Sequence, residues 1–446
     1  MTALADLAEA LKEAALKAGA DAADAMALRE SAVSVDVRHG ALEHAERAEA
    51  TELGLRVLVG QRQACVSASD IAPATMTALA ERALAMARAA PEDPSLGLAD
   101  PREIARDWDL GALDLVDPEA EPDAGALLAS ALALEAAALS RDGITQAEAS
   151  AGHVRREVFV AQSNGFSGGH ARSHSTRGVV AYCGSGTGME RDSAFEMRLH
   201  AADLPEAGEI GRRAGDRALS RLGAVKPPTG RYPVLFDERV GASLIGHLLA
   251  AINGEAIARG ASWARDLMGK SVLPPGMSLV EDPLRPRGPA SRPFDAEGLA
   301  TRPTAFVEDG RLCGWVLDLA TARRLGLKSS ANAIRGPSSP PAPGITNLEL
   351  TPGARSREDL IRDMGTGLLV TSLIGATINP NTGDYSRGAS GFWVEGGRIA
   401  HPVHEGTIAG NLREMLATLV AADDAREHRA MRVPSLLVEK MTLAGA

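Results

Sequence analysis

The apolar positions at the start of the chain repeat first with the period of a helix and then with that of a strand. Residues 4–15 place Leu and Ala side chains on one helical face, and Gly19 is placed to end that helix. Residues 25–69 alternate or carry β-branched clusters between turn residues, which predicts a meander of antiparallel strands. Asp70 is placed to cap a second helix. The expected buried face of that helix comprises Met76, Leu79, Ala83 and Met86.

The order of helix, meander and helix recurs further along the chain. Residues 123–139 and 205–222 have helical patterns, and the strand-rich residues 156–186 lie between them. Both strand-rich stretches precede a helix that begins at an acidic residue. We therefore predict two related helix–meander–helix units.

The last part of the chain has a different pattern. The sequence KPPTGRYP at residues 226–233 has the composition of a linker. One helical segment follows it, and then many strand patterns, which a Pro-rich loop at residues 335–344 interrupts. The predicted fold is α+β, with two helix–β-meander–helix units followed by a β-rich C-terminal domain. The predicted domains cover residues 1–115, 116–225 and 226–446.

Composition and charge narrow the possible functions. A chain of 446 residues is too long for one ordinary core, and its net charge of -11 without a dense Lys/Arg block argues against nucleic-acid binding. The most apolar run, residues 127–139, contains Glu135 and is too short to span a bilayer. The start of the chain has no signal-peptide pattern. Cys65, Cys183 and Cys313 form no C-x-x-C motif, which is typical of a reducing compartment, so we expect a cytoplasmic protein.

Short motifs do not supply a complete active site. The sequence GSGTG at residues 184–188 lacks the Lys and Ser/Thr of a phosphate loop, which favours a turn between strands. Two His pairs have metal-like spacing, but Gly and Ser surround the first and Pro402 interrupts the second. We expect surface or turn histidines at both places. The pairs are His170 with His174, and His401 with His404 beside Glu405.

The most distinctive stretch covers residues 375–416, GATINPNTGDYSRGASGFWVEGGRIAHPVHEGTIAGNLREML. Its order N-P-x-T-G-D-Y-S-R-G-A-x-G-F-W, followed by T-I-A-G-N-L, closely resembles the C-terminal signature of the PmbA (TldE) branch of the TldD/PmbA family. The resemblance extends over the whole length of the chain. It implies a cytosolic assembly in which a TldD-type and a PmbA/TldE-type subunit pair to proteolyse small or unfolded polypeptides. The older family label, modulator of DNA gyrase, does not imply contact with DNA.

The resemblance also implies that residues 241–262, GASLIGHLLAAINGEAIARGAS, correspond to the metal-binding helix of TldD-type subunits. TldD-type subunits carry H-E-x-x-x-H on this helix, with two zinc ligands and a glutamate as general base, and a third ligand is a cysteine near the C-terminus. Aligning His247 with the second histidine places Ala242 at the first and Ser243 at the glutamate. No cysteine follows Cys313. The resemblance therefore implies no zinc in this chain and zinc on a TldD-type partner.

The periodicity of this helix agrees with a lost metal site. Ligands five residues apart lie roughly 140° around a regular helix, so a two-histidine site needs a distorted turn. Apolar side chains here recur every four residues, which predicts a regular, buried helix. They are Val240, Leu244, Leu248 and Ile252. We expect His247 to be a hydrogen-bonded helix histidine and not a ligand.

The C-terminal signature has two interpretations. Its glycines are expected to supply turns and close backbone approach in strands. Its polar residues either shape the wall of a peptide-holding cavity or pair with one another and buttress a turn, and the structural role is favoured. The glycines are Gly375, Gly383, Gly388 and Gly391, and the polar residues are Asn379, Asp384, Tyr385 and Arg387.

The favoured function is that of a non-catalytic PmbA/TldE-type subunit that forms a heterodimer with a TldD-type zinc peptidase and helps to bind unfolded peptide. One alternative is an independent hydrolase of unrecognised mechanism. The other is a peptide-binding or scaffold protein that acts as a homodimer. None of the three involves nucleic acid or a membrane.

Overall fold

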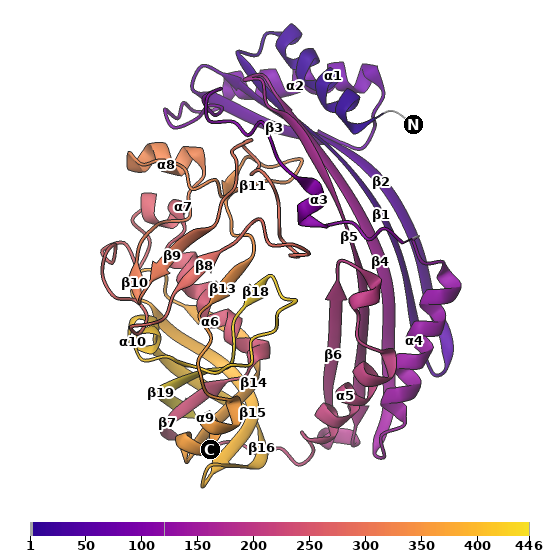
Figure 1. Cartoon of the computed structure of the whole chain (residues 1–446), viewed down its shortest axis with the longest axis vertical. Helices are drawn as coiled ribbons and strands as arrows, with labels where there is room; N and C mark the ends of the chain where they lie inside the picture. Colours follow the sequence, from indigo (N-terminus) through magenta and orange to yellow (C-terminus); the bar gives the residue numbers. More distant parts are fainter. Residues whose placement is uncertain (1–2, 120, 446) are drawn as a thin grey trace.

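A long curved sheet forms one side of the molecule in the computed structural model, which describes residues 3–119 and 121–445 (Figure 1). Its six strands are all antiparallel and lie in the order β3-β2-β1-β4-β5-β6. The strands are β1 (Ala22–Arg38), β2 (Ala41–Val59), β3 (Arg62–Ala68), β4 (Ile144–Gln162), β5 (Ser167–Cys183) and β6 (Glu190–Arg198). Strands β1 and β4 pair from Asp24 opposite Gln162 to Arg38 opposite Glu148, which joins the two meanders into one sheet.

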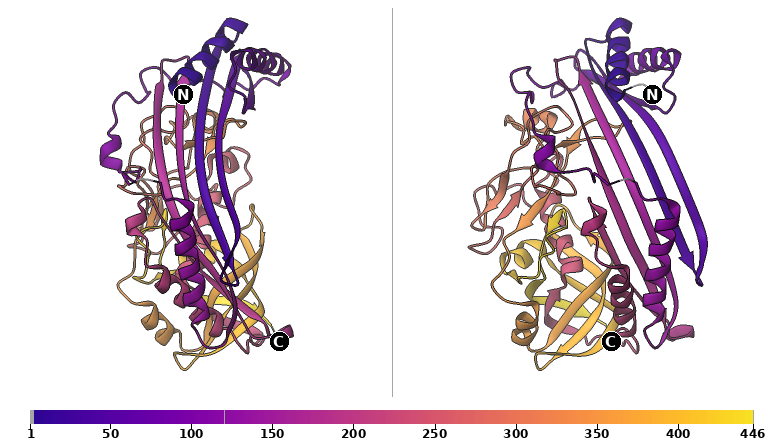
Figure 2. Two further views of the ribbon diagram at one scale, coloured as in Figure 1. Left: turned by 90° about the vertical axis from the view of Figure 1, so that its right-hand side faces the viewer. Right: turned by 45° about the vertical axis from the view of Figure 1, so that its right-hand side comes forward.

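Two helix pairs cover one face of this sheet. Alternate side chains of a strand point to the same face, and the odd-numbered residues of β1 pack against helices at both ends. Ala23, Ala25 and Ala27 share a core with one helix pair, while Val33 and Val35 share a core with the other. The first pair is α1 (Leu4–Ala18) and α2 (Pro73–Ala89), and the second is α4 (Ala124–Leu139) and α5 (Ala207–Leu219). The opposite face is left for the C-terminal domain (Figures 1 and 2).

A closed five-stranded barrel forms the centre of the C-terminal domain. Its strands pair in the order β7–β14–β15–β16–β19 and back to β7, and only the β7–β14 pair is parallel. They are β7 (Gly230–Phe236), β14 (Gly367–Ile378), β15 (Asp384–Glu395), β16 (Arg398–Asn411) and β19 (Leu436–Ala444). Helix α6 (Glu238–Ala251) shares one hydrophobic core with the barrel through its Leu and Ile side chains.

Short elements make up the rest of this domain (Figure 2). A second sheet has the order β10-β9-β8-β13-β18, and β11 and β12 form a separate two-stranded ladder. Their bounds are β8 (Leu279–Glu281), β9 (Thr304–Glu308), β10 (Arg311–Leu312), β11 (Ala333–Ile334), β12 (Ala342–Pro343), β13 (Leu348–Leu350) and β18 (Met431–Arg432). The remaining elements are α3 (Leu110–Leu113), α7 (Gly254–Ala258), α8 (Leu319–Leu325), α9 (Arg357–Met364), α10 (Leu412–Ala417) and β17 (Val420–Ala421). No helix within the described ranges has the length and apolar character needed to cross a membrane.

The structure confirms the α+β class and the repeated order of helix, three strands and helix. Some details of the sequence prediction are wrong. The C-terminal domain has α7 to α10 besides α6, because helices of five to eight residues are too short to show a period. The proposed linker ends early, since β7 begins at Gly230. Asp70 does not cap α2 but accepts hydrogen bonds from the Ala72 amide and the Thr75 hydroxyl, and Met86 is 48% exposed.

Gly391 and Gly388 of β15 differ in how closely the backbone of β14 approaches them, and this difference can be tested. A methyl group on Gly391 would lie 1.9 Å from the Leu369 carbonyl oxygen of β14, whereas one on Gly388 would lie 3.3 Å from the Ile374 oxygen. Gly391→Ala is expected to lower the free energy of unfolding by about 1–3 kcal/mol, because the strands must separate locally. Gly388→Ala serves as the matched control and stays within about 1 kcal/mol of the parent. Denaturant unfolding monitored by tryptophan fluorescence checks both, and equal effects would contradict this account of Gly391.

Candidate functional site

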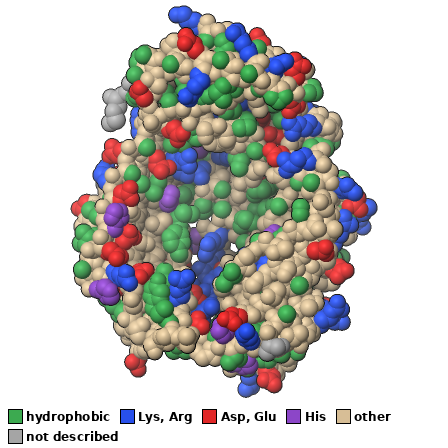
Figure 3. All heavy atoms as spheres, turned by 180° about the vertical axis from the view of Figure 1, so that it is seen from behind, with side chains coloured by type: hydrophobic (Ala, Val, Ile, Leu, Met, Phe, Trp, Pro, Cys, Tyr) green, Lys and Arg blue, Asp and Glu red, His purple; other side chains and the backbone are tan. Residues whose placement is uncertain are grey.

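The C-terminal domain and the β6 side of the sheet enclose a cavity of about 1110 Å³. Strands β5 and β6 line one wall, and α6, β14 and β15 line the other. Seen from behind, the molecule is hollowed between the sheet and the C-terminal domain, and hydrophobic and basic side chains gather in the hollow (Figure 3). Ser243 and Arg387, two of the residues selected from the sequence, both line the cavity.

Helix α6 is regular over its 14 residues, as its periodicity predicted. The Asp237 carboxylate caps it by accepting a hydrogen bond of 3.2 Å from the Arg239 amide. The Ser243 hydroxyl donates to the Val240 carbonyl oxygen one turn back (2.7 Å). Ala242 lines a neighbouring cavity of about 620 Å³ that also borders β6. A serine bound to its own helix has no base to activate it.

His247 follows Ser243 by one turn of α6 and is half-buried. Its ring meets the edge of the Tyr385 ring at a centroid distance of 5.7 Å and an interplanar angle of 75°. Its Nε2 is buried and forms no hydrogen bond with any described residue, so the predicted hydrogen bond is wrong. Burial lowers the pKa of His247, and Arg387 lowers it further. The imidazole is therefore a neutral packing group at pH 7.

The donor set of α6 does not fit a catalytic zinc ion. Such a site takes three protein ligands and keeps an open position, but α6 offers one imidazole beside an alanine and a serine. Across residues 3–119 and 121–445, no three His, Cys, Asp or Glu side chains are placed to hold a metal together. No hydrolytic step through a metal can be assigned to these residues.

The polar residues of the C-terminal signature form a well-bonded turn between β14 and β15. The Asn379 side-chain oxygen accepts from the amides of Asn381 (2.9 Å) and Thr382 (3.3 Å). Asp384 accepts from the hydroxyl of Thr382 (2.6 Å) and from Asn411 (3.1 Å), and these bonds lower its pKa.

Two further signature residues point away from that turn. Arg387 donates through Nε to the Gly375 carbonyl oxygen (2.6 Å) and does not pair with Asp384, so this part of the expected mutual pairing is wrong, although Arg387 interacts with Tyr385. Tyr385 is 2% exposed, and burial raises its pKa to about 12 although Arg387 acts in the opposite direction. The structure therefore brings Ser243, His247, Tyr385 and Arg387 together and leaves Asn379 in the turn.

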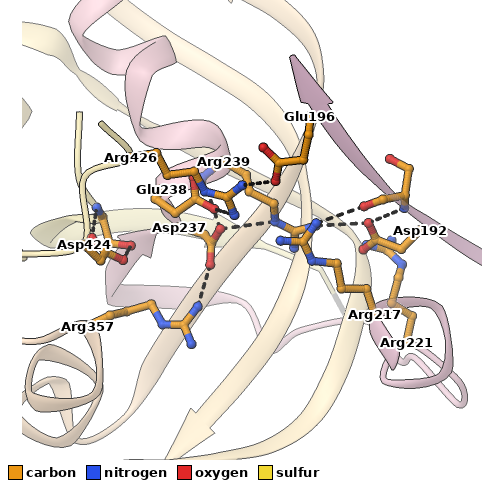
Figure 4. Close-up of polar contacts among 12 residues, drawn as sticks. Asp192, Glu196, Arg217, Arg221, Asp237, Glu238, Arg239, Arg357, Asp424 and Arg426 are labelled. Carbon is orange, nitrogen blue, oxygen red and sulfur yellow. Dashed lines mark hydrogen bonds and ion pairs between the residues drawn. The ribbon is translucent and has the colours of Figure 1, made fainter. Parts of the chain in front are cut away.

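An ion-pair network that the sequence did not predict connects β6 to the start of α6 (Figure 4). Asp192 of β6 binds Arg239 of α6 at 3.0 Å, and Asp237 binds Arg357 of α9 at 2.9 Å. Arg426 joins Glu196 of β6 (3.4 Å) and Glu238 of α6.

The walls of the large cavity carry an excess of positive charge. Seven arginines and two acidic residues line it. The arginines are Arg191, Arg217, Arg221, Arg239, Arg387, Arg426 and Arg429, and the acids are Glu190 and Asp192. Burial and the neighbouring Arg239 lower the pKa of Arg217 to about 10. These arginines are scattered over more than 200 residues of an acidic chain, so no local motif could have revealed the cluster.

The other sequence motifs have structural positions. Gly186–Gly188 forms the turn between β5 and β6, as predicted. His170 and His174 lie within β5, and His401 and His404 lie within β16, so none of them is in a turn. Burial lowers the pKa of His170 to about 3, and the expectation of a surface residue is wrong there.

Comparisons with known proteins identify the family to which the chain belongs. The family models of the PmbA/TldA metallopeptidase domain 1, central domain and C-terminal domain match residues 23–87, 117–222 and 229–445. The chain belongs to the PmbA/TldD metallopeptidase family, as its C-terminal signature predicted.

Within the family, two PmbA proteins match the chain over nearly its whole length. It is 35% identical to the metalloprotease PmbA of Escherichia coli O157:H7, with 95% of this chain and 92% of that protein covered. A PmbA homologue of Haemophilus influenzae is also 35% identical, with 97% and 94% covered. A TldD homologue of the same organism is 27% identical over 55% of this chain and 51% of its own length.

Solved structures share the complete fold. A protein of Bacteroides thetaiotaomicron that carries the name modulator of DNA gyrase superposes with a TM-score of 0.91 at 26% identity, covering 99% of this chain and 98% of its own. TldE of Thermococcus kodakarensis superposes with a TM-score of 0.85 at 22% identity, covering 98% and 100%. At this last identity the likeness concerns the fold alone.

His247 gives a prediction for stability. Phe in its place keeps a ring against Tyr385 and removes the buried, unpaired Nε2, so His247→Phe is expected to be as stable as the parent at pH 7 or about 1 kcal/mol more stable. The folded pKa of His247 lies below its unfolded value of 6.5, so the unfolded state takes up the proton first as the pH falls. The parent therefore loses stability below about pH 6.5, and the advantage of the variant grows from pH 7 to pH 5.

Urea unfolding at several pH values measures this difference. His44→Phe is the matched control. The His44 side chain is 61% exposed, so this substitution removes no buried nitrogen. Strong destabilisation of His247→Phe at pH 7, or an advantage that shrinks in acid, would show that the imidazole has a polar partner.

Proposed function

We propose that this chain is the non-catalytic PmbA/TldE-type subunit of a cytoplasmic peptidase and that it pairs with a TldD-type, zinc-bearing subunit. The observation that carries the proposal is which residues α6 has at the positions of the metal ligands and the general base. In a family fold that is matched over nearly its whole length, the helix that bears the metal ligands in TldD-type subunits has Ala242, Ser243 and a half-buried His247. A zinc mechanism needs a bound water and a base to activate it, and this helix supplies neither.

The cavity beside α6 supports a role in holding peptide. Strand β6 forms an edge of the six-stranded sheet and lines the cavity, and an edge strand can pair with an extended peptide. At the middle of this edge, the Ser193 amide and carbonyl oxygen bind the Asp192 carboxylate and the Arg217 guanidinium. Phe195 on β6 and Ile374 on β14 offer exposed apolar contacts there, and the arginine-rich walls suit carboxylates of a peptide. In this proposal the chain forms one wall of a chamber, and the partner supplies the metal.

The cytoplasmic location is part of the same proposal. Cys65, Cys183 and Cys313 are all unpaired in the structure. Free thiols are typical of a reducing compartment, and the family resemblance implies the same location.

The proposal predicts that the purified chain does not bind stoichiometric zinc. At most one ligand remains on α6, and a single imidazole binds zinc far more weakly than a three-ligand site. Elemental analysis after dialysis is expected to give well below one zinc per chain. About one zinc per chain, lost in His247→Ala, would contradict the proposal.

A restoration experiment extends this test. Ala242→His with Ser243→Glu is expected not to create a peptidase, because the third ligand and the distorted helical turn are still absent. Cleavage of an unfolded peptide that stops on addition of a chelator would show that α6 accommodates a working site.

A mixing experiment tests the partner role. Peptidase activity on an unfolded peptide is expected only when this chain and a TldD-type chain are combined. Full activity of the TldD-type chain alone would contradict the partner role, and cleavage by this chain alone would favour an independent hydrolase.

A pair of variants locates the peptide-holding wall in the same assay. Phe195 and Leu42 are both 51% exposed, but only Phe195 lines the cavity. Phe195→Glu is expected to lower the activity of the mixture about fivefold, which corresponds to one apolar contact of about 1 kcal/mol. Leu42→Glu is expected to have no effect, and equal losses would remove the support for this wall.

A further inference from the structure

A second, smaller cavity lies between the open face of the sheet and the loops of the C-terminal domain. Its volume is about 320 Å³. Alternate residues of β1, β4 and β5 form the sheet wall, among them Arg156, His170 and Arg172. Arg292 and Arg335 come from the facing loops. None of these residues lines the larger cavity beside α6, so the two sites are separate.

The charges around this cavity are unbalanced. Four arginines line it, and Asp295 is the acidic residue among the described lining residues. The Asp295 carboxylate is already held by the backbone amides of Glu297 (2.9 Å), Leu299 (3.0 Å) and Ala333 (3.1 Å).

The carboxylates next to the cavity are also engaged. Asp24 binds Arg335 at 2.7 Å and is shared with Arg56 at 3.0 Å. Glu281 accepts hydrogen bonds from Asn332 and Thr346. Arg335 therefore pairs with Asp24 and Arg156 pairs with Glu30 (3.8 Å), whereas Arg172 and Arg292 form no ion pair with any described residue.

Several donors at the cavity are buried without a partner among the described residues. The Arg335 side chain is 0% exposed, and its Nη2 forms no hydrogen bond. Arg292 donates through Nη1 to the Ala333 carbonyl oxygen (3.0 Å), but its Nε and Nη2 are unpaired. The Nδ1 of His170 is buried and unpaired as well. Buried donors are rarely left unsatisfied, because each costs free energy.

We infer that this cavity is a binding site for a small organic carboxylate with an apolar body. The planar guanidinium group of Arg292 presents its free Nε and Nη2 as a pair, which suits the two oxygens of a carboxylate, and Arg335 adds its free Nη2. Val158, Phe294 and Ile334 form an apolar part of the wall, which inorganic phosphate cannot use. The volume is at the lower end of the range for small-molecule sites.

A binding measurement on the purified chain tests the inference. N-acetylleucine is expected to bind with a dissociation constant below about 1 mM, measured by isothermal titration calorimetry. N-acetylleucinamide has the same shape without the charge and is expected to bind at least about tenfold more weakly. Equal binding of acid and amide, or no binding of the acid at 10 mM, would overturn the inference.

Variants place the ligand in this cavity. Arg292→Met removes the charge and keeps the length, and the exposed Arg302→Met is its matched control on the same segment. Ile334→Glu adds a negative charge at a wall residue that is 44% exposed, so it tests the site without disturbing the core. Arg292→Met and Ile334→Glu are each expected to weaken N-acetylleucine binding at least tenfold, and Arg302→Met to leave it unchanged. Loss in all three variants, or in none, would place the ligand elsewhere.

A comparison of two peptides shows whether the carboxylate comes from the C-terminus of a peptide or from a small free acid. Acetyl-Ala-Ala-Leu with a free carboxyl end is compared with its C-terminal amide. Binding of the acid form alone identifies the C-terminus of a peptide as a ligand. If neither form binds while N-acetylleucine does, the cavity takes small free acids. The measurement needs no partner subunit, so its failure would leave the proposed pairing with a TldD-type chain untouched.

Discussion

The pairing of β1 with β4 is the contact on which the rest of the molecule depends. Fifteen residues of each strand lie in continuous antiparallel register, so two separate meanders become one six-stranded sheet. Because side chains alternate along a strand, this register puts the small apolar residues of both units on the same face. Both helix pairs cover that face, and the other face remains open for the C-terminal domain. A shift of one residue would exchange the faces and remove both the helix cores and the cavity walls.

The two cavities follow from this arrangement. The sheet is curved and meets a barrel at one end and irregular loops further along, so its open face is not filled completely (Figures 1 and 3). Arginine is well suited to such gaps, because its long stem packs on apolar surface while its head reaches carboxylates and carbonyl oxygens. Arg239, Arg357 and Arg426 use their heads to bind α6 and its surroundings to neighbouring elements. A chain of net charge -11 thus places positive charge along its internal cavities.

The sequence predicted the parts of the fold that have a long period. The four helices of the two N-terminal units and the strands of the meanders repeat apolar positions over many residues, and the order of the two units could be read from them. Short helices such as α7 and the two-residue strands have no such signal. The candidate site was located because α6 and the signature of β15 are local in sequence. The cavity arginines and the Asp192–Arg239 pair could not be predicted, since their partners are brought together only by tertiary packing.

The regularity of α6 is itself an argument about its chemistry. Two ligands five residues apart can face one ion only if the helix departs from its normal winding, and that departure weakens backbone hydrogen bonds. Metal binding can offset such a cost. Without the ligands, nothing favours the distortion, and a regular helix that buries Leu244, Ile245 and Leu248 in the barrel core is the more stable state. His247 then turns toward Tyr385, where only ring packing holds it. The helix is a structural support of the cavity wall, which agrees with the proposed role of a subunit whose partner carries the metal.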